Sequence, residues 1–280
     1  QLAVWHERPR IAPIVNQETA MPTRRPFALL MLPLTTAALA VATFALPAFA
    51  QAATVEISTG LFGAKITGSG KVIDDKRNAA PFNRLRLDSA ITVNARPAAA
   101  PGVTVRADDN IAPLILTSVE GDTLVIKLKT NTGIRTDSPL VVTVDFTRLT
   151  HADLRGSGDL NIASLKGEQF ELSLAGSGDV RLDGAELSRL TARLAGSGDI
   201  WVKGKADEAT YNLAGSGDVH AADLAAKRVS VDIAGSGDVK VNATDSLSVQ
   251  IAGSGDVAYS GNPPKVTSRV VGSGDLRAIR

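Results

Sequence analysis

The tetrapeptide Gly-Ser-Gly-Asp occurs seven times in the chain, and this repeat restricts the fold more than any other feature of the sequence. The copies begin at Gly156, Gly176, Gly196, Gly215, Gly235, Gly253 and Gly272. They are separated by 18 to 20 residues, and a degenerate eighth copy stands at residues 68–71. A fixed period of this length is typical of solenoids, in which each repeat covers the apolar face of its neighbour. The sequence therefore predicts a stack of similar units.

Between the copies, apolar and polar residues alternate. The second, fourth and sixth residues before each tetrapeptide are mostly apolar, as in Leu190, Ala192 and Leu194. A period of two predicts a β-strand with one buried face and one exposed face. The alternation resumes after each aspartate, and no window between the copies sustains a helical period. Each unit is therefore expected to run as strand, sharp corner, strand and polar bend.

We expect an all-β fold, a single-stranded parallel β-helix with about 20 residues per rung and an irregular N-terminal β cap. An up-and-down barrel or a propeller is the geometric alternative, although a propeller blade needs about twice this length. Glycine suits a sharp corner because it tolerates positive φ and close backbone approach. The predicted corner glycines are Gly156, Gly158, Gly176, Gly178, Gly196, Gly198, Gly215, Gly217, Gly235, Gly237, Gly253, Gly255, Gly272 and Gly274.

The chain divides into four parts by sequence pattern. Residues 151–280 hold the repeats, and residues 51–150 hold strand-like runs without clean copies, so we expect the latter to cap one end of the coil. Residues 21–50 begin with a basic pair and continue into an apolar run that ends in Ala48-Phe49-Ala50, which predicts a cleaved signal peptide. Residues 1–20 precede the first Met and are expected to be disordered read-through.

Two alternatives stay open at the N-terminus. The apolar run is long enough to cross a bilayer, so a retained anchor is the alternative to cleavage. Arg24 and Arg25 resemble a twin-arginine export signal, but adjacent arginines also occur in ordinary secretory signals. In either export route, cleavage would leave no membrane span, and we expect a periplasmic or secreted protein.

Several upstream motifs, in addition to the repeat, point to a known family. Residues 107–110 read Ala-Asp-Asp-Asn, and residues 121–127 read Gly-Asp-Thr-Leu-Val-Ile-Lys. With Gly-Ser-Gly-Asp-Val at this spacing, the chain resembles the DUF2807 family, named for a putative autotransporter adhesin head, the GIN domain. The likeness spans roughly residues 66–280. It implies an exported bacterial β-helical domain with no established enzyme activity.

Composition excludes several classes of function. Thirty basic residues face 29 acidic ones, which leaves no electrostatic footprint for nucleic acid. The chain has no cysteine, and aromatic residues make up 4 % of it. Beyond residue 50 only His151 and His220 are histidines, and they fall on different rungs. Neither a catalytic triad nor a three-histidine metal site can be built from them, so we expect no catalytic residues and no enzyme.

The repeated aspartates are the candidate metal ligands. They are Asp159, Asp179, Asp199, Asp218, Asp238, Asp256 and Asp275. Stacked about 5 Å apart, neighbours would repel by roughly 0.8 kcal/mol in water. Hydrogen bonds from nearby backbone amides at each turn are the structural explanation, and a Ca²⁺ ion is the alternative. We favour the structural explanation and expect no required cofactor.

Trp201 is the single aromatic residue that the alternation places outward, beside His220 one rung away, so it is the candidate surface anchor. The leading hypothesis is a non-enzymatic exported scaffold or adhesin-like protein whose ladder faces engage an envelope macromolecule or cell-wall glycan. The alternatives are a β-helix that binds or cleaves polysaccharide through its acidic ladder, and a calcium-stabilised exported scaffold.

Overall fold

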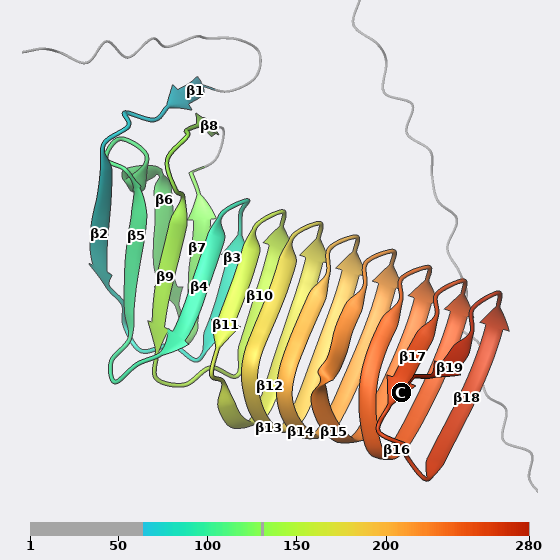
Figure 1. Ribbon diagram of the computed structural model, residues 1–280. Helices are drawn as coiled ribbons and strands as arrows, with labels where there is room; N and C mark the ends of the chain where they lie inside the picture. The colour runs from blue at the N-terminus through green and yellow to red at the C-terminus, as the bar shows by residue number, and fades with distance from the viewer. Residues whose placement is uncertain (1–63, 130–131, 280) are drawn as a thin grey trace, which may run out of the picture. The chain divides into compact units, whose positions relative to one another are not determined.

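The computed structural model describes residues 64–129 and 132–279, so the expected read-through and signal peptide lie outside the described residues. The described part consists almost entirely of β-strands, with one short 3-10 helix, η1 (Ala112–Leu114), and no α-helix. It contains no helix with the length and apolar character needed to span a bilayer. The predicted all-β solenoid with a repeat of about 20 residues is confirmed (Figure 1).

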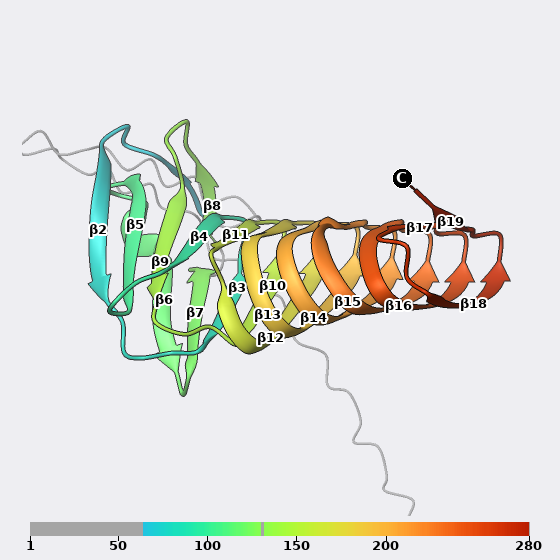
Figure 2. The same ribbon diagram turned by 60° about the horizontal axis from the view of Figure 1, so that its bottom comes forward.

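The solenoid is a parallel sheet that winds on itself. Its strands are β10 (His151–Gly156), β11 (Asp159–Ala163), β12 (Lys166–Gly176), β13 (Asp179–Gly196), β14 (Ile200–Gly215), β15 (Val219–Gly235), β16 (Val239–Gly253), β17 (Val257–Ser260), β18 (Lys265–Gly272) and β19 (Leu276–Ala278). In each coil, a long segment ends at the glycine corner and a short segment follows it. We call the outer surfaces of these segments the long-strand face and the short-strand face. Figure 2 shows the coils following one another away from the N-terminal strands.

The coils stack in register, and this register fills the core. Leu194 of β13 pairs with Leu213 of β14, which pairs with Ile233 of β15. All three side chains are buried, as are their inward neighbours two residues away. Because every coil places apolar side chains at the same inward positions, each coil covers the apolar surface of the one before it.

The N-terminal part contributes the first coil of the solenoid and also contains strands that pair differently. Its strands are β1 (Ala64–Thr67), β2 (Val72–Asn78), β3 (Arg84–Asp88), β4 (Thr92–Pro97), β5 (Gly102–Asp108), β6 (Ile115–Glu120), β7 (Thr123–Leu128), β8 (Thr132–Arg135) and β9 (Val141–Phe146). Strands β3 and β4 form a coil without glycines beneath β10 and β11. Strands β7 and β9 pair in parallel with β3 and β4, whereas β2, β5 and β6 pair antiparallel. The irregular β cap is therefore partly antiparallel.

The corners are places where backbone stacks on backbone. A Cβ added to Gly176 would lie 2.1 Å from the carbonyl oxygen of Gly156, and the corresponding distance from Gly196 to Gly176 is also 2.1 Å. The first glycine of each corner also has positive φ, for example 144° at Gly196, whereas the second is restricted by close approach alone. In the coil without glycines, Ser89 and Ile91 form the corner. Gly156 and Gly158 of the next coil stack on the backbone of these two residues.

The degenerate copy at residues 68–71 does not join this ladder. It connects β1 to β2, and the Ser69 hydroxyl donates to Asp109 while the Ser69 amide donates to the Asn110 side chain. A Cβ at Gly68 would collide with the buried carboxylate of Asp108. Sequence similarity to the repeat is thus misleading here, because this glycine makes room for a side chain rather than for a preceding corner.

Candidate binding face of the solenoid

The repeated aspartates form one row at the corners, and five of the seven accept a backbone N–H from the next coil. The backbone N–H of Asp218 donates to Oδ1 of Asp199 at 2.9 Å, and that of Asp238 donates to Oδ1 of Asp218 at 2.8 Å. The same bond joins Asp179 to Asp199, Asp238 to Asp256 and Asp256 to Asp275. The expected amide bonds within a turn are therefore replaced by bonds between coils. Each of these five carboxylates thus stabilises the stack that brings it close to its neighbours.

The aspartate row does not form a metal centre in the described residues, which contain no group of three or more His, Asp or Glu side chains placed to hold an ion. Each coil contributes a single carboxylate, and one of its oxygens already accepts an amide in most coils. A calcium site would need six to eight oxygen ligands around one point. The donor set of this row is smaller than that.

Trp201 lies on the short-strand face inside a stack of side chains. The guanidinium carbon of Arg181 is 4.3 Å from the centroid of its ring, and the ring of His220 stacks at 5.1 Å with an interplanar angle of 20°. Arg181 and His220 belong to the coils before and after that of Trp201, so they cover opposite faces of the indole. The ring is partly buried and presents mainly its edge, which makes it a poor platform for a flat ligand.

The two histidines lie far apart in the fold, as their places in the sequence suggested. His151 is on β10, at the long-strand face, with Nε2 3.3 Å from Glu171 Oε2, whereas His220 is on β15. Burial lowers the pKa of His151, and the nearby charge of Arg84 lowers it further. The charges of Asp153 and Asp122 oppose this lowering of the pKa only in part. Glu171 also pairs with Arg193. Nδ1 of His151 lies 3.0 Å from the Thr150 hydroxyl, which itself donates to the carbonyl oxygen of Asn83. Within the described residues, the two histidines lie on different coils.

Part of the long-strand face is occupied by ion pairs within the chain. Glu208 accepts hydrogen bonds from Arg189 at 2.8 Å and from Arg228 at 2.7 Å, one on each neighbouring coil. These bonds lower the pKa of Glu208, the bond from Arg228 contributing most. These side chains satisfy one another across the coils and offer few free groups to a ligand.

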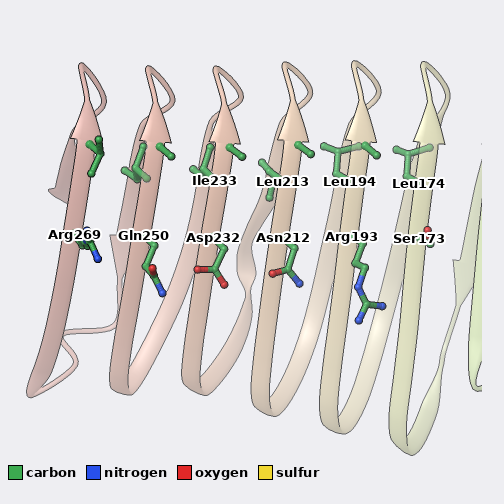
Figure 3. Close-up of a pocket in the computed structure, with 16 residues that line it drawn as sticks. Ser173, Leu174, Arg193, Leu194, Asn212, Leu213, Asp232, Ile233, Gln250 and Arg269 are labelled. Carbon is green, nitrogen blue, oxygen red and sulfur yellow. The ribbon is translucent and has the colours of Figure 1, made fainter. Parts of the chain in front are cut away.

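A groove of about 730 Å³ crosses the coils on the long-strand face, next to the corners. Two rows of outward-facing residues line the groove, and they alternate along each strand with the buried leucine and isoleucine residues. The first is a row of small exposed residues, namely Ala195, Ala214, Ala234, Ala252 and Val271. The second, two residues earlier in each coil, is Ser173, Arg193, Asn212, Asp232, Gln250 and Arg269. Figure 3 shows these polar side chains one per strand at a common height. We call this second row the polar rim.

Most of the polar rim has no partner within the part of the chain that the structure describes. Arg193 pairs with Glu171, but no hydrogen bond or ion pair joins the side chains of Asn212, Asp232, Gln250 or Arg269 to other groups there. This distinguishes the rim from the aspartate row and from the Glu208 cluster, whose side chains are bound across the coils. Of these three sets of side chains, the rim is therefore the one most able to bond an external molecule.

Sequence reasoning did not find this groove. The alternation shows that these residues point outward, but an outward alanine row is visible only after the coils are aligned by register. Arg155 holds the same register position in β10, opposite Ala175, so alanine occupies this position only from β12 onward. A signal was present in the repeated Ala-Gly-Ser-Gly-Asp, since alanine precedes five of the seven tetrapeptides.

Comparisons with known proteins agree on the fold and point to one family. Residues 81–263 match the model of the family described as "Putative auto-transporter adhesin, head GIN domain". A crystal structure of a "putative adhesin" from Bacteroides fragilis is 24% identical, with a TM-score of 0.72, and the match covers 76% of this chain and all of that one. A "putative lipid binding protein" from Parabacteroides distasonis is 28% identical, with a TM-score of 0.65, covering 77% of this chain and all of that one. A search of curated proteins finds no match.

Proposed function

Since this chain belongs to the DUF2807 family of adhesin-head GIN domains, we propose that it is a non-enzymatic exported protein that binds another macromolecule of the cell envelope through the long-strand face of its solenoid. The family description implies an exported protein. Within that description, a periplasmic or secreted location and a binding role are the parts we propose.

The observation that supports this function is the groove with its polar rim. It extends over coils from β12 to β18, and it is bordered by side chains without partners in the described part of the chain. A surface that repeats the same chemistry in successive coils suits an extended partner, because each coil adds one similar contact. The aspartate row and the Trp201 stack offer less, since their groups bond to neighbouring coils.

The arrangement of side chains favours binding over catalysis. Hydrolysis of a glycosidic bond ordinarily needs two carboxyl groups on either side of the bond. In the groove, Asp232 is the one acidic residue among the lining side chains. The groove therefore supplies contacts without an acid and base pair.

Cosedimentation with separated envelope fractions tests this function. The full chain would be mixed with cell-wall sacculi, lipopolysaccharide and membrane vesicles, and each supernatant would be assayed for released sugars. We expect the chain to pellet with at least one fraction, without product release, and the Ala234→Arg variant to pellet about tenfold less. A chain that stays in the supernatant with every fraction, or that releases sugars, would contradict the proposal.

A second candidate function is lipid binding, which the name of the Parabacteroides distasonis relative suggests. In this chain the same groove would hold the lipid, because alanine methyl groups form much of its lining. Titration of the full chain with a fluorescent fatty acid tests this candidate. Saturable binding that the Ala234→Arg variant lacks would support it.

A further inference from the structure

We propose that the groove binds an extended, uncharged glycan whose chain runs across the coils, parallel to the solenoid axis. This inference rests on the proposed function, because it names the ligand class of the face described there. It assigns the contacts to the alanine row and the polar rim, and not to the aspartate row at the corners.

The groove repeats once with every coil. Neighbouring strands of a parallel sheet lie about 4.8 Å apart, so the groove offers one alanine methyl group and one rim side chain at each such step. That step is comparable to the length of one pyranose ring in an extended glycan. A glycan that lies along the axis can therefore repeat similar contacts from Ala195 on β13 to Ala252 on β16.

The groove is bordered by side chains that can hydrogen-bond a ligand. Asn212, Asp232 and Gln250 are consecutive in register, and none bonds to another group in the described residues. Two residues earlier, a hydroxyl row runs beside them, formed by Thr191, Thr210, Ser230, Ser248 and Thr267. Sugar hydroxyls both donate and accept hydrogen bonds, and so do hydroxyl and amide side chains. The two rows together match a ligand with many hydroxyl groups.

The charges along the groove are mixed. The rim carries Arg193, Asp232 and Arg269, so its charges alternate in sign along the groove, and the positive charge of Arg193 is already matched by Glu171. A polyanion would meet Asp232, and a polycation would meet the arginines, and like charges in contact are unfavourable. An uncharged chain avoids both conflicts, so the rim complements it best.

The floor of the groove favours a glycan over an acyl chain. The apolar residues beneath it are already buried, with exposures of 2 % for Leu194, 5 % for Leu213 and 3 % for Ile233. An acyl chain would gain contact mainly with alanine methyl groups, and the gain from burial scales with the apolar area removed from water. A sugar ring needs only a shallow apolar floor for its C–H face while its hydroxyls reach the rim.

The test uses neutral glycans and matched alanine variants of the full chain. Binding to cello-oligosaccharides, laminarin, dextran, mannan and total envelope polysaccharide would be measured by calorimetry. We expect Ala214→Trp to lower affinity at least tenfold by filling the groove. Asn212→Ala and Gln250→Ala should each weaken binding about three- to tenfold, the effect of one lost hydrogen bond. The control is Ala225→Trp, since Ala225 is an exposed alanine of the solenoid away from the groove.

Three outcomes would overturn this inference. They are the absence of binding to every polysaccharide, equal losses in Ala214→Trp and Ala225→Trp, and binding to phospholipid vesicles alone. The cosedimentation assay separates this inference from the proposed function. If the chain pellets with an envelope fraction but binds none of the polysaccharides, the binding function stands and the glycan does not. If it pellets with no envelope fraction, the binding function itself is wrong.

Discussion

The hydrogen at Gly217 faces the backbone of Gly198, and a Cβ built in its place would lie 2.0 Å from the Gly198 carbonyl oxygen. Because that oxygen belongs to the corner of the preceding coil, one methyl group would push two coils apart. The sequence predicts that the glycines allow tight corners, and the structure shows which backbone atom each glycine approaches. The stacking of the corners can therefore be tested directly.

We expect Gly217→Ala to lower the free energy of unfolding by at least about 2 kcal/mol, since the new methyl group meets backbone that cannot rotate away. Thermal and urea unfolding of the purified variant measure the loss. The matched control is Gly167→Ala, because a Cβ at Gly167 meets nothing within 4 Å. Equal stability of the two variants would contradict stacked corners.

The aspartate row should tolerate an amide better than a methyl group. Asp218 accepts the N–H of Asp238 through Oδ1, and an asparagine at this position keeps a carbonyl acceptor while removing one negative charge from the row. We expect Asp218→Asn to be neutral or slightly stabilising, and Asp218→Ala to cost about 1 kcal/mol. Thermal midpoints at low and high salt measure both effects. A larger loss for asparagine than for alanine would show that the charge itself is needed.

Calcium should leave the stability of the chain unchanged. The described residues contain no cluster suited to an ion, and the row supplies one carboxylate per coil. A ligand that binds only the folded state raises the thermal midpoint. We therefore expect the same midpoint in millimolar calcium and in chelator. A rise of several degrees in the midpoint with calcium but not with magnesium would support the alternative hypothesis of a calcium-stabilised scaffold.

Trp201 should matter for stability more than for binding. Its ring lies between Arg181 and His220, and loss of a stacked aromatic ring with a cation over it costs about 1–2 kcal/mol. We expect Trp201→Ala to lower the thermal midpoint and to leave glycan affinity within twofold of the parent chain. The control is Lys240→Ala, which removes the side chain that follows His220 in the same row. Loss of binding in Trp201→Ala alone would make it the anchor that its exposure in the sequence pattern suggested.

His151 gives the stability a pH dependence of known sign. Its pKa is lower in the folded chain than the ordinary value of 6.5, first through burial and then through the charge of Arg84. The unfolded chain therefore binds more protons between the folded pKa and 6.5, so this residue adds stability above that window and loses it as pH falls through it. We expect His151→Asn to flatten the dependence of the urea midpoint between pH 7.5 and pH 5. An unchanged slope would assign the dependence to other groups.

The sequence alone determined the repeat and the direction of most side chains within it. Period-two alternation around a recurring Gly-Ser-Gly-Asp specifies strand, corner and strand, because only one face of each strand can bury leucine, isoleucine and valine. The placement of Leu213 inward and of Trp201 and His220 as outward neighbours follows from that alternation. These are local properties, and counting residues along the chain is enough to obtain them.

The tertiary structure decided how the coils meet one another. Register placed the Asp238 amide on the Asp218 carboxylate, covered both faces of Trp201, and aligned Ala214 with Ala234 to form a groove. It also removed residues 68–71 from the ladder, because Gly68 faces Asp108 instead of a preceding corner. Such contacts depend on which residues of separate coils become neighbours. The spacing between corners varies from 18 to 20 residues, so the coils stay in register only if the bends between corners accommodate the extra residues. The folded chain shows where these register shifts occur.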